Sequence, residues 1–272
     1  MISAELQPDQ QPERWDDHVS VYEAVFEPFT LQFAQHAIAA LGLAAGRSVL
    51  DVGAGSGGAA LAMAERGLAV TAIDASPRMV ARIFQRARHS RVTIQARAMD
   101  GQALKFADGT FDAALSVLGV ILFPDAARGL AEMRRVVRAG GSISVVTWTE
   151  PQHYELAVEL RAAIQSVWPE QPPAPLPAQL RYREQNDFRA LFAAAGLGQP
   201  VIDKVTARLE VPAARWLAER IGFAPGMAAM TADLGYRRPA VIERFVENLE
   251  TRLGTGPIGL AGVTFIGTAT VA

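Results

Sequence analysis

A short apolar segment that holds an aspartate and leads into closely spaced glycines is the part of this chain best suited to chemistry. Asp51 lies within the segment Val49–Val52, which is followed by Gly53, Gly55 and Gly57. Glycine permits sharp turns and lets a ligand approach the backbone without meeting a Cβ atom. If a helix follows, its free N–H groups point into the same gap. The pattern therefore predicts a strand, loop and helix that bind the polar end of a nucleotide-like ligand.

Two kinds of ligand fit such a loop. Gly53, Gly55 and Gly58 match the spacing G-x-G-x-x-G of dinucleotide sites, in which the loop binds a pyrophosphate. Asp51 argues against a pyrophosphate, because two anions repel each other, whereas a ligand with an ammonium group would be attracted. The residues favour the ammonium-bearing ligand. An NAD(P)-dependent oxidoreductase that uses the same loop remains the alternative.

The block V-L-D-V-G-A-G-S-G at residues 49–57 closely resembles motif I of class I S-adenosylmethionine-dependent methyltransferases. The resemblance covers residues 47–150 motif by motif and residues 184–272 more loosely, and it departs at Ala139, where the family usually has proline. The segment 111–125 is similar to the ubiquinone and menaquinone group of these enzymes. The resemblance implies S-adenosylmethionine as cofactor, with its amino-acid end on the glycine loop, and transfer of its methyl group by in-line attack.

Acidic residues at the ends of later apolar segments extend this resemblance. It implies that Asp74 accepts hydrogen bonds from both ribose hydroxyls, although Asp74 also lies beside a helix start at Ser76. Asp100 is implied to accept from the adenine amino group, although aspartate before Gly101 is also an ordinary turn. The predicted cofactor-binding residues are Tyr22, Asp51, Gly53, Ala54, Gly55, Gly57, Asp74, Ala75, Met79, Asp100, Gly101, Ser116 and Val117.

Three side chains are candidates for a general base. His153 and Tyr154 follow the predicted strand 142–148, and His18 lies in the N-terminal helical segment. A histidine or tyrosine at the ligand edge of the sheet can take a proton from an oxygen or nitrogen acceptor. Each also has a simpler explanation, as an exposed loop residue or as part of a helix packed on the core. Some members of the resembled family need no base.

Alternating strand and helix patterns must position these residues. They predict a Rossmann-like α/β fold, with a seven-stranded, mostly parallel sheet, helices on both faces and a helical lid. The alternation of the last strand predicts an antiparallel partner at the edge of the sheet. Predicted strands are 49–52, 69–74, 92–98, 111–117, 142–148, 200–209 and 263–271, and predicted helices are 59–66, 126–138, 153–168, 184–195, 213–221 and 239–253.

The chain divides into four parts on this pattern. They are an N-terminal helical segment (1–46), a cofactor-binding core (47–150), a helical and proline-rich insertion (151–183), and a C-terminal part of the sheet (184–272) with a lid insertion at about 211–256. Helical spacing gives the first part an apolar stripe formed by Trp15, Val19, Tyr22 and Phe26.

The lid indicates the class of acceptor. Its apolar residues suit a hydrophobic or aromatic small molecule, although any two packed helices need an apolar seam. These residues are Trp216, Leu217, Ile221, Phe223, Met227 and Met230.

The composition restricts the function further. The 272 residues are 50% hydrophobic and 20% charged, with a net charge of −2 and no cysteine, so disulfides, thiolate metal sites and cysteine nucleophiles are excluded. We expect no metal site, no nucleic-acid partner and no membrane partner, and a cytoplasmic location because no signal peptide or membrane span is evident. A homodimer is compatible with the sequence. A protein that binds the cofactor without catalysis is a further alternative.

One charge pattern requires interpretation. Arg78, Arg82 and Arg86 follow helical spacing, and no acidic residue lies between positions 75 and 99. Such a stripe can bind phosphate, but the balanced total charge favours a solvated helix face.

Overall fold

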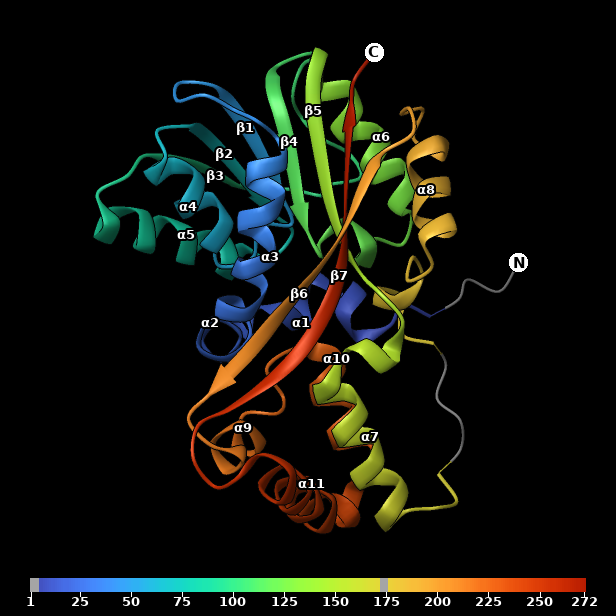
Figure 1. Ribbon diagram of the computed structural model, residues 1–272. Coiled ribbons are helices and arrows are strands. Elements are labelled where there is room, and N and C mark those ends of the chain that lie inside the picture. Colours follow the sequence, from blue (N-terminus) through green and yellow to red (C-terminus); the bar gives the residue numbers. More distant parts are fainter. Residues whose placement is uncertain (1–4, 172–175) are drawn as a thin grey trace.

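The sheet has seven strands in the order β3-β2-β1-β4-β5-β7-β6, in a computed structural model that describes residues 5–171 and 176–272 (Figure 1). The first five strands in this order pair in parallel, whereas β7 is antiparallel to both β5 and β6. The predicted mostly parallel, Rossmann-like sheet is therefore confirmed. The strands are β1 (Ser48–Val52), β2 (Ala69–Asp74), β3 (Ile94–Ala98), β4 (Phe111–Val117), β5 (Val137–Trp148), β6 (Val201–Val211) and β7 (Ile258–Thr270).

Helices cover both faces of the sheet. On one face lie α3 (Glu27–Ala40), α4 (Gly58–Glu65) and α5 (Pro77–Ser90), and on the other lie α6 (Ala126–Val136) and α8 (Gln185–Ala194). The central strand β1 packs against both layers, because Val49 belongs to one core and Leu50 and Val52 belong to the other. Burial on both faces explains why this strand is a continuous apolar run around Asp51.

The helical lid connects the far ends of β6 and β7, which form a long hairpin that extends beyond the rest of the sheet (Figure 1). It contains α9 (Ala214–Glu219), α10 (Pro225–Ala232) and α11 (Arg238–Leu253), and α11 packs against both α9 and α7 (Glu155–Val167). The lid insertion predicted at about 211–256 therefore packs against α7, the helix of the 151–183 insertion. The central part of the predicted proline-rich loop, residues 172–175, lies outside the described residues.

The prediction that the last strand lies at the sheet edge is wrong. β7 pairs with β5 on one side and β6 on the other, so β6 forms the edge. The alternation in β7 arises because its small residues make room for large side chains of the helix above them. A Cβ added at Gly267 would lie 2.8 Å from Phe188 and 2.9 Å from Phe192 of α8. These small residues are thus covered by helix α8 rather than by water.

The N-terminal segment forms three helices, α1 (Pro12–Trp15), α2 (Val19–Val25) and α3, where the spacing predicted a single stripe. Pro28 is the second residue of α3, and because it has no backbone N–H it cannot continue the hydrogen-bond ladder of α2, so α2 ends at Val25 and a new helix begins at Glu27. The stripe survives this break as edge-to-face contacts of Tyr22 with Trp15 (5.8 Å between ring centroids) and with Phe26 (5.9 Å).

Within residues 5–171 and 176–272, every helix is too short or too polar to cross a lipid bilayer.

Candidate active site

A cavity of about 410 Å³ lies where the carboxyl ends of β1, β2 and β4 meet. The connection after β1 leads to β2 on one side and the connection after β4 leads to β5 on the other, and ligands bind at such a switch point in open α/β sheets. One part of the cavity is lined by the loops that follow β1 to β4, and the other part is lined by the N-terminal segment and the lid. Among the described residues, the loop lining includes Gly53, Gly55, Asp74, Ala75, Met79, Asp100, Gly101, Val117, Leu118 and Gly119.

The glycine loop after β1 is a tight turn attached to β2. Gly53, Gly55 and Gly57 have φ values of 71°, 54° and 93°, in the left-handed region that favours glycine. The backbone N–H groups of Gly53 and Ala54 both donate to the carbonyl of Ile73, each at 2.9 Å. These glycines therefore allow the loop to fold back on itself, as well as to face a ligand.

Asp74 lies at the end of β2 and faces the cavity. Its Oδ2 accepts from the N–H of Gly55 at 2.8 Å, and its Oδ1 accepts from the N–H of Ser76 at 2.9 Å. Burial raises its pKa, and these backbone N–H groups oppose the rise. The helix start expected here is real, but Ser76 is its cap, because its hydroxyl accepts from the N–H of Met79 at 3.1 Å. The carboxylate of Asp74 is therefore left for the loop and for a ligand.

Asp51 lies in the sheet interior next to the loop, with 1% of its surface exposed. Its Oδ2 has no hydrogen-bond partner, and it borders a second cavity of about 30 Å³ that Tyr22, Glu27, Thr30 and Ala54 also line. Burial, followed by the negative charges of Asp74 and Glu27, raises the pKa of Asp51 to about 7. An unpaired buried carboxylate is costly, so this recess favours a cationic ligand group.

The loops after β3 and β4 complete this end of the cavity. Asp100 accepts from the N–H of Gln102 at 2.8 Å, which is an ordinary turn bond that leaves the carboxylate exposed to the cavity. At Gly101 a side chain would collide with Phe123. Ser116 is absent from the lining, because its buried hydroxyl donates to the carbonyl of Val52 at 2.8 Å and accepts from Val120 at 3.0 Å.

Two of the predicted cofactor residues therefore act behind the cavity surface rather than on it. Ser116 ties β4 to β1, and Gly57 packs against α5, where an added Cβ would lie 2.8 Å from Ile83. Leu118, which no sequence pattern marked, lines the cavity with a φ of 59°. Such a value is unusual for a residue other than glycine and is often found at functional sites.

The two predicted histidines lie away from the cavity lining. The Nδ1 atom of His153 pairs with Glu150 at 3.0 Å and approaches Thr149 at 3.3 Å, whereas the Nδ1 of His18 bonds to the Arg14 carbonyl at 2.7 Å. Tyr154 does line the cavity, but burial and then the negative charge of Asp9 raise the pKa of its hydroxyl, so its neutral form is favoured.

Asp9 is a cavity residue that sequence reasoning missed. It belongs to the short helix η1 (Pro8–Gln10), and its Oδ1 accepts from the N–H of Gly226 at the start of α10, at 2.7 Å. Burial raises its pKa, against the opposing influence of the Gly226 N–H and His18. Only tertiary packing brings η1 to the lid, and no local pattern marks such a contact.

Comparison with known proteins identifies the central part of the chain. Residues 49–141, which include the glycine loop, Asp74 and Asp100, match the family model described as "Methyltransferase domain". Residues 49–141 form a methyltransferase domain.

Relatives of this methyltransferase domain include characterised and uncharacterised proteins. An uncharacterised protein of Mycobacterium tuberculosis is 41% identical over 112 residues, which are 41% of each chain. The 2-methyl-6-phytyl-1,4-hydroquinone methyltransferase of Synechocystis is 35% identical over 147 residues, which are 50% of this chain and 46% of that enzyme. The chain thus spans less than half the length of these curated relatives.

The fold is shared more widely than the domain's sequence. The solved [4+2]-cyclase SpnF has a TM-score of 0.60 and 19% identity, with 98% of this chain and 97% of that chain covered. At this level of identity the likeness shows the fold alone.

The far wall of the cavity, beyond the loops of the methyltransferase domain, is mainly aromatic. Phe26 of the N-terminal segment stacks on Phe223 of the lid at 4.7 Å between ring centroids, and Trp148 stacks on Tyr154 at 4.9 Å. Of the six lid residues predicted to line the pocket, Phe223 and Met227 do so. Leu217 and Ile221 are fully buried in the lid core, which is the apolar seam that packed helices need.

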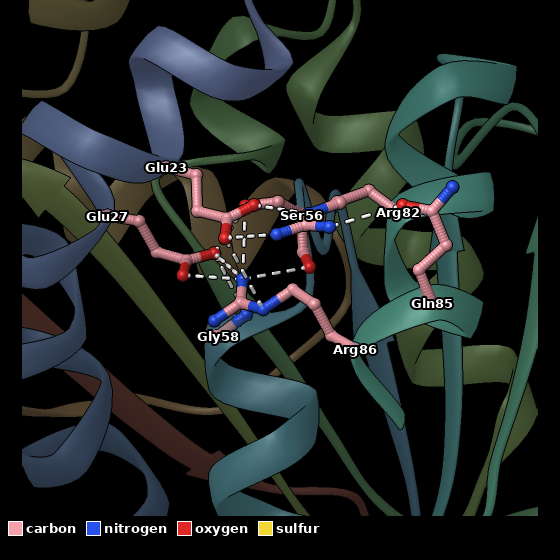
Figure 2. Close-up of polar contacts among 7 residues, drawn as sticks. All are labelled: Glu23, Glu27, Ser56, Gly58, Arg82, Gln85 and Arg86. Carbon is pink, nitrogen blue, oxygen red and sulfur yellow. Dashed lines mark hydrogen bonds and ion pairs between the residues drawn. The ribbon is translucent and has the colours of Figure 1, made fainter. Parts of the chain in front are cut away.

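The arginine stripe on α5 is paired with acidic residues of the N-terminal segment. Arg78 pairs with Asp17 at 3.1 Å, and Arg82 and Arg86 each have a carboxylate oxygen 2.6 Å away, on Glu23 and Glu27 respectively (Figure 2). The interpretation as a solvated face is wrong for Arg82 and Arg86, which are partly buried against the N-terminal segment, whereas the side chain of Arg78 is 65% exposed. The ion pairs attach α2 and α3 to the methyltransferase domain.

Proposed function

We propose that this chain transfers a methyl group from S-adenosylmethionine to a small hydrophobic or aromatic acceptor. The observation that carries the proposal is the acidic polar end of the cavity, where the glycine loop lies between Asp74 and the unpartnered Oδ2 of Asp51. A ligand with an ammonium group and neighbouring hydroxyls matches these acceptors, whereas a pyrophosphate would be repelled.

The residues present fit this cofactor. Asp51 and the second cavity would hold its ammonium group, Asp74 would accept from the ribose hydroxyls, and Asp100 and Gly101 would lie beside the adenine. When bound, S-adenosylmethionine supplies an electrophilic methyl group on a sulfonium centre. The chain supplies the position of the two reactants and a cavity walled by aromatic side chains, which excludes water from them.

The acceptor is proposed from the far wall. Trp15, Phe26, Trp148 and Phe223 line it with aromatic rings, and Asp9 is a half-buried carboxylate among them that can accept a proton from a hydroxyl or amine. The hydroquinone substrate in the name of the Synechocystis relative is also an aromatic ring with ionisable hydroxyls. We therefore propose a hydroxylated aromatic acceptor.

An NAD(P)-dependent oxidoreductase is opposed by the bonding of the loop. The N–H groups of Gly53, Ala54, Gly55 and Gly58 already donate to protein oxygens, and two of these oxygens are carboxylates. A pyrophosphate depends on such N–H groups being available. A pyrophosphate bound at this loop would therefore meet the carboxylates of Asp74 and Glu27 in place of unpaired N–H groups.

Calorimetric titration with S-adenosylmethionine, S-adenosylhomocysteine and NADH, side by side, tests the proposal. We expect the two sulfur compounds to bind and NADH not to bind. Binding of NADH alone would overturn the proposal and point to a reductase. A screen of hydroquinones and phenols for release of S-adenosylhomocysteine would then identify the acceptor, and binding without any turnover would favour a non-catalytic cofactor-binding protein.

A further inference from the structure

The carboxylate of Glu27 occupies the amino end of helix α4. Glu27 is the first residue of α3, and 7% of its surface is exposed. Its Oε1 accepts from the N–H of Gly58, the first residue of α4, at 3.1 Å, and from the hydroxyl of Ser56 (Figure 2). The amino end of a helix carries partial positive charge and binds anions such as phosphate. Here a side chain of the protein itself takes the place of that anion.

Arg86 of α5 holds this carboxylate from the other side. Its Nη1 lies 2.6 Å from Oε2 and 2.8 Å from Oε1 of Glu27, and it also donates to the carbonyl of Ser56 at 3.0 Å. Ser56 is therefore bound at its hydroxyl by Glu27 and at its carbonyl by Arg86 (Figure 2). Charged hydrogen bonds in such a buried position are strong, and removing one partner leaves the other unpaired.

The approach of Glu27 also explains the glycine at position 58. A Cβ added at Gly58 would lie 2.7 Å from Cδ of Glu27. In the sequence, Gly58 completes a dinucleotide-type spacing. In the structure it gives access to a carboxylate.

We infer that Glu27, held by Arg86, is a positioning and specificity-determining residue of the glycine loop. It fills the anion place at the start of α4 and fixes residues 56–58. It thereby excludes a phosphate and leaves the recess beside Asp51 to a cationic group. The part of this inference that concerns the ligand rests on the proposed function. The occupation of the anion position by Glu27 does not depend on it.

A neighbouring ion pair provides a matched control. Glu23 and Arg82 join α2 to α5 through two hydrogen bonds of 2.6 and 2.7 Å (Figure 2). Among the hydrogen bonds and ion pairs of the described residues, this pair approaches Glu27 and Arg86 through a distance of 4.0 Å between Glu23 and Arg86. The variant E23Q therefore weakens the docking of the N-terminal segment and spares the amino end of α4.

The experiment compares E27A, E27Q and E23Q with the wild-type chain. Calorimetry with S-adenosylhomocysteine should show at least a tenfold loss of affinity in E27A and E27Q, and a change of less than twofold in E23Q. In E27A the Arg86 guanidinium, the Ser56 hydroxyl and the Gly58 N–H lose their common acceptor. Formate at constant ionic strength should therefore raise the melting temperature of E27A and restore its affinity, with no such effect on the wild type.

Three results would overturn the inference. The first is S-adenosylhomocysteine affinity within twofold of the wild type in both Glu27 variants. The second is an equal loss in E23Q, which would reduce Glu27 to one of several docking contacts. The third is an E27A protein that formate neither stabilises nor rescues. If E27A does not fold, the S-adenosylhomocysteine affinities of E27Q and E23Q are compared instead, and an equal loss in the two variants overturns the inference. If the wild type fails to bind S-adenosylhomocysteine, the proposed function fails. The effect of formate on the melting temperature of E27A then still tests whether Glu27 fills the anion position at the amino end of α4.

Discussion

Asp74 accepts a hydrogen bond from the backbone N–H of Gly55 at 2.8 Å, which ties the end of β2 to the glycine loop after β1. The other carboxylate oxygen accepts from Ser76 at 2.9 Å. Each carboxylate oxygen can accept a second hydrogen bond, so two acceptor positions remain for a ligand diol. One side chain thus shapes the loop and faces the cavity.

Replacing Asp74 with alanine should weaken binding of S-adenosylhomocysteine by roughly tenfold to a hundredfold. This corresponds to a loss of about 1.5–3 kcal/mol of charged hydrogen bonding. D74N, which keeps one oxygen as acceptor, should lose less affinity than D74A. Calorimetric titration of the three proteins checks this order, and unchanged affinity in D74A would remove Asp74 from the site.

Replacing Gly55 with valine should abolish binding. Gly55 has a φ of 54°, which a β-branched residue adopts only with strain, and an added Cβ would already lie 3.5 Å from the Tyr22 ring. The valine methyl groups would then enter the space between the loop and that ring. A titration in which G55V binds S-adenosylhomocysteine as the wild type does would show that the ligand lies elsewhere.

The buried Asp51 should make both stability and binding depend on pH. Its folded-state pKa of about 7 lies above its usual value of 3.8, so the folded protein binds more protons than the unfolded chain between these values. The stability of the ligand-free protein should therefore fall as pH rises from about 4 to about 7. Melting temperatures across this range, compared between the wild type and D51N, test this: the D51N curve should lack that part of the fall.

Binding should show the opposite dependence on pH. A cationic group beside Asp51 favours the ionised carboxylate, so S-adenosylhomocysteine should bind more tightly as pH rises through about 7 and should release a proton. Calorimetry in two buffers of different ionisation enthalpy measures that proton. Equal heats in the two buffers would argue against contact between the ligand and Asp51.

Asp9 should matter for turnover more than for cofactor binding. D9N keeps an acceptor for the Gly226 N–H but cannot take a proton, so methyl transfer should slow by about a hundredfold or more. G226A separates the two roles, because its new Cβ would collide with Asp9 while leaving the carboxylate intact. Single-turnover rates with an acceptor from the screen provide the measurement. A D9N rate near that of the wild type, with G226A impaired, would leave Asp9 as a structural contact only.

The sequence predicted those features that depend on neighbouring residues. The glycine loop, Asp74 at the end of β2 and the Ser76 cap each arise within a few positions of one another, and each was found where expected. The boundary between the predicted helix 126–138 and the predicted strand 142–148 proved different, because α6 ends at Val136 and β5 begins at Val137 through an irregular pairing with Phe111. That difference reflects the partner strand rather than the local pattern.

Features that depend on distant partners were not predictable in this way. Arg86 and Glu27 are 59 positions apart, so no local pattern on α5 indicates that its arginines have acidic partners in the N-terminal segment. Ser116 and His153 were misjudged for a similar reason, since the hydroxyl is used by β1 and the imidazole by Glu150. A side chain at the active edge of a sheet reaches the ligand only if nearer partners leave it free.

The β6–β7 hairpin has a consequence for how acceptor choice can change. The chain leaves the sheet at Val211 and returns at Ile258, and these two residues are paired in the hairpin register. A segment whose ends are adjacent can be lengthened or exchanged with little effect on the rest of the molecule. Residues 212–257 therefore form a natural cassette that shares a packing surface with α7 and contributes Phe223 and Met227 to the cavity. Recombination at these two ends would exchange part of the acceptor wall and leave the glycine loop, Asp74 and Asp51 in place.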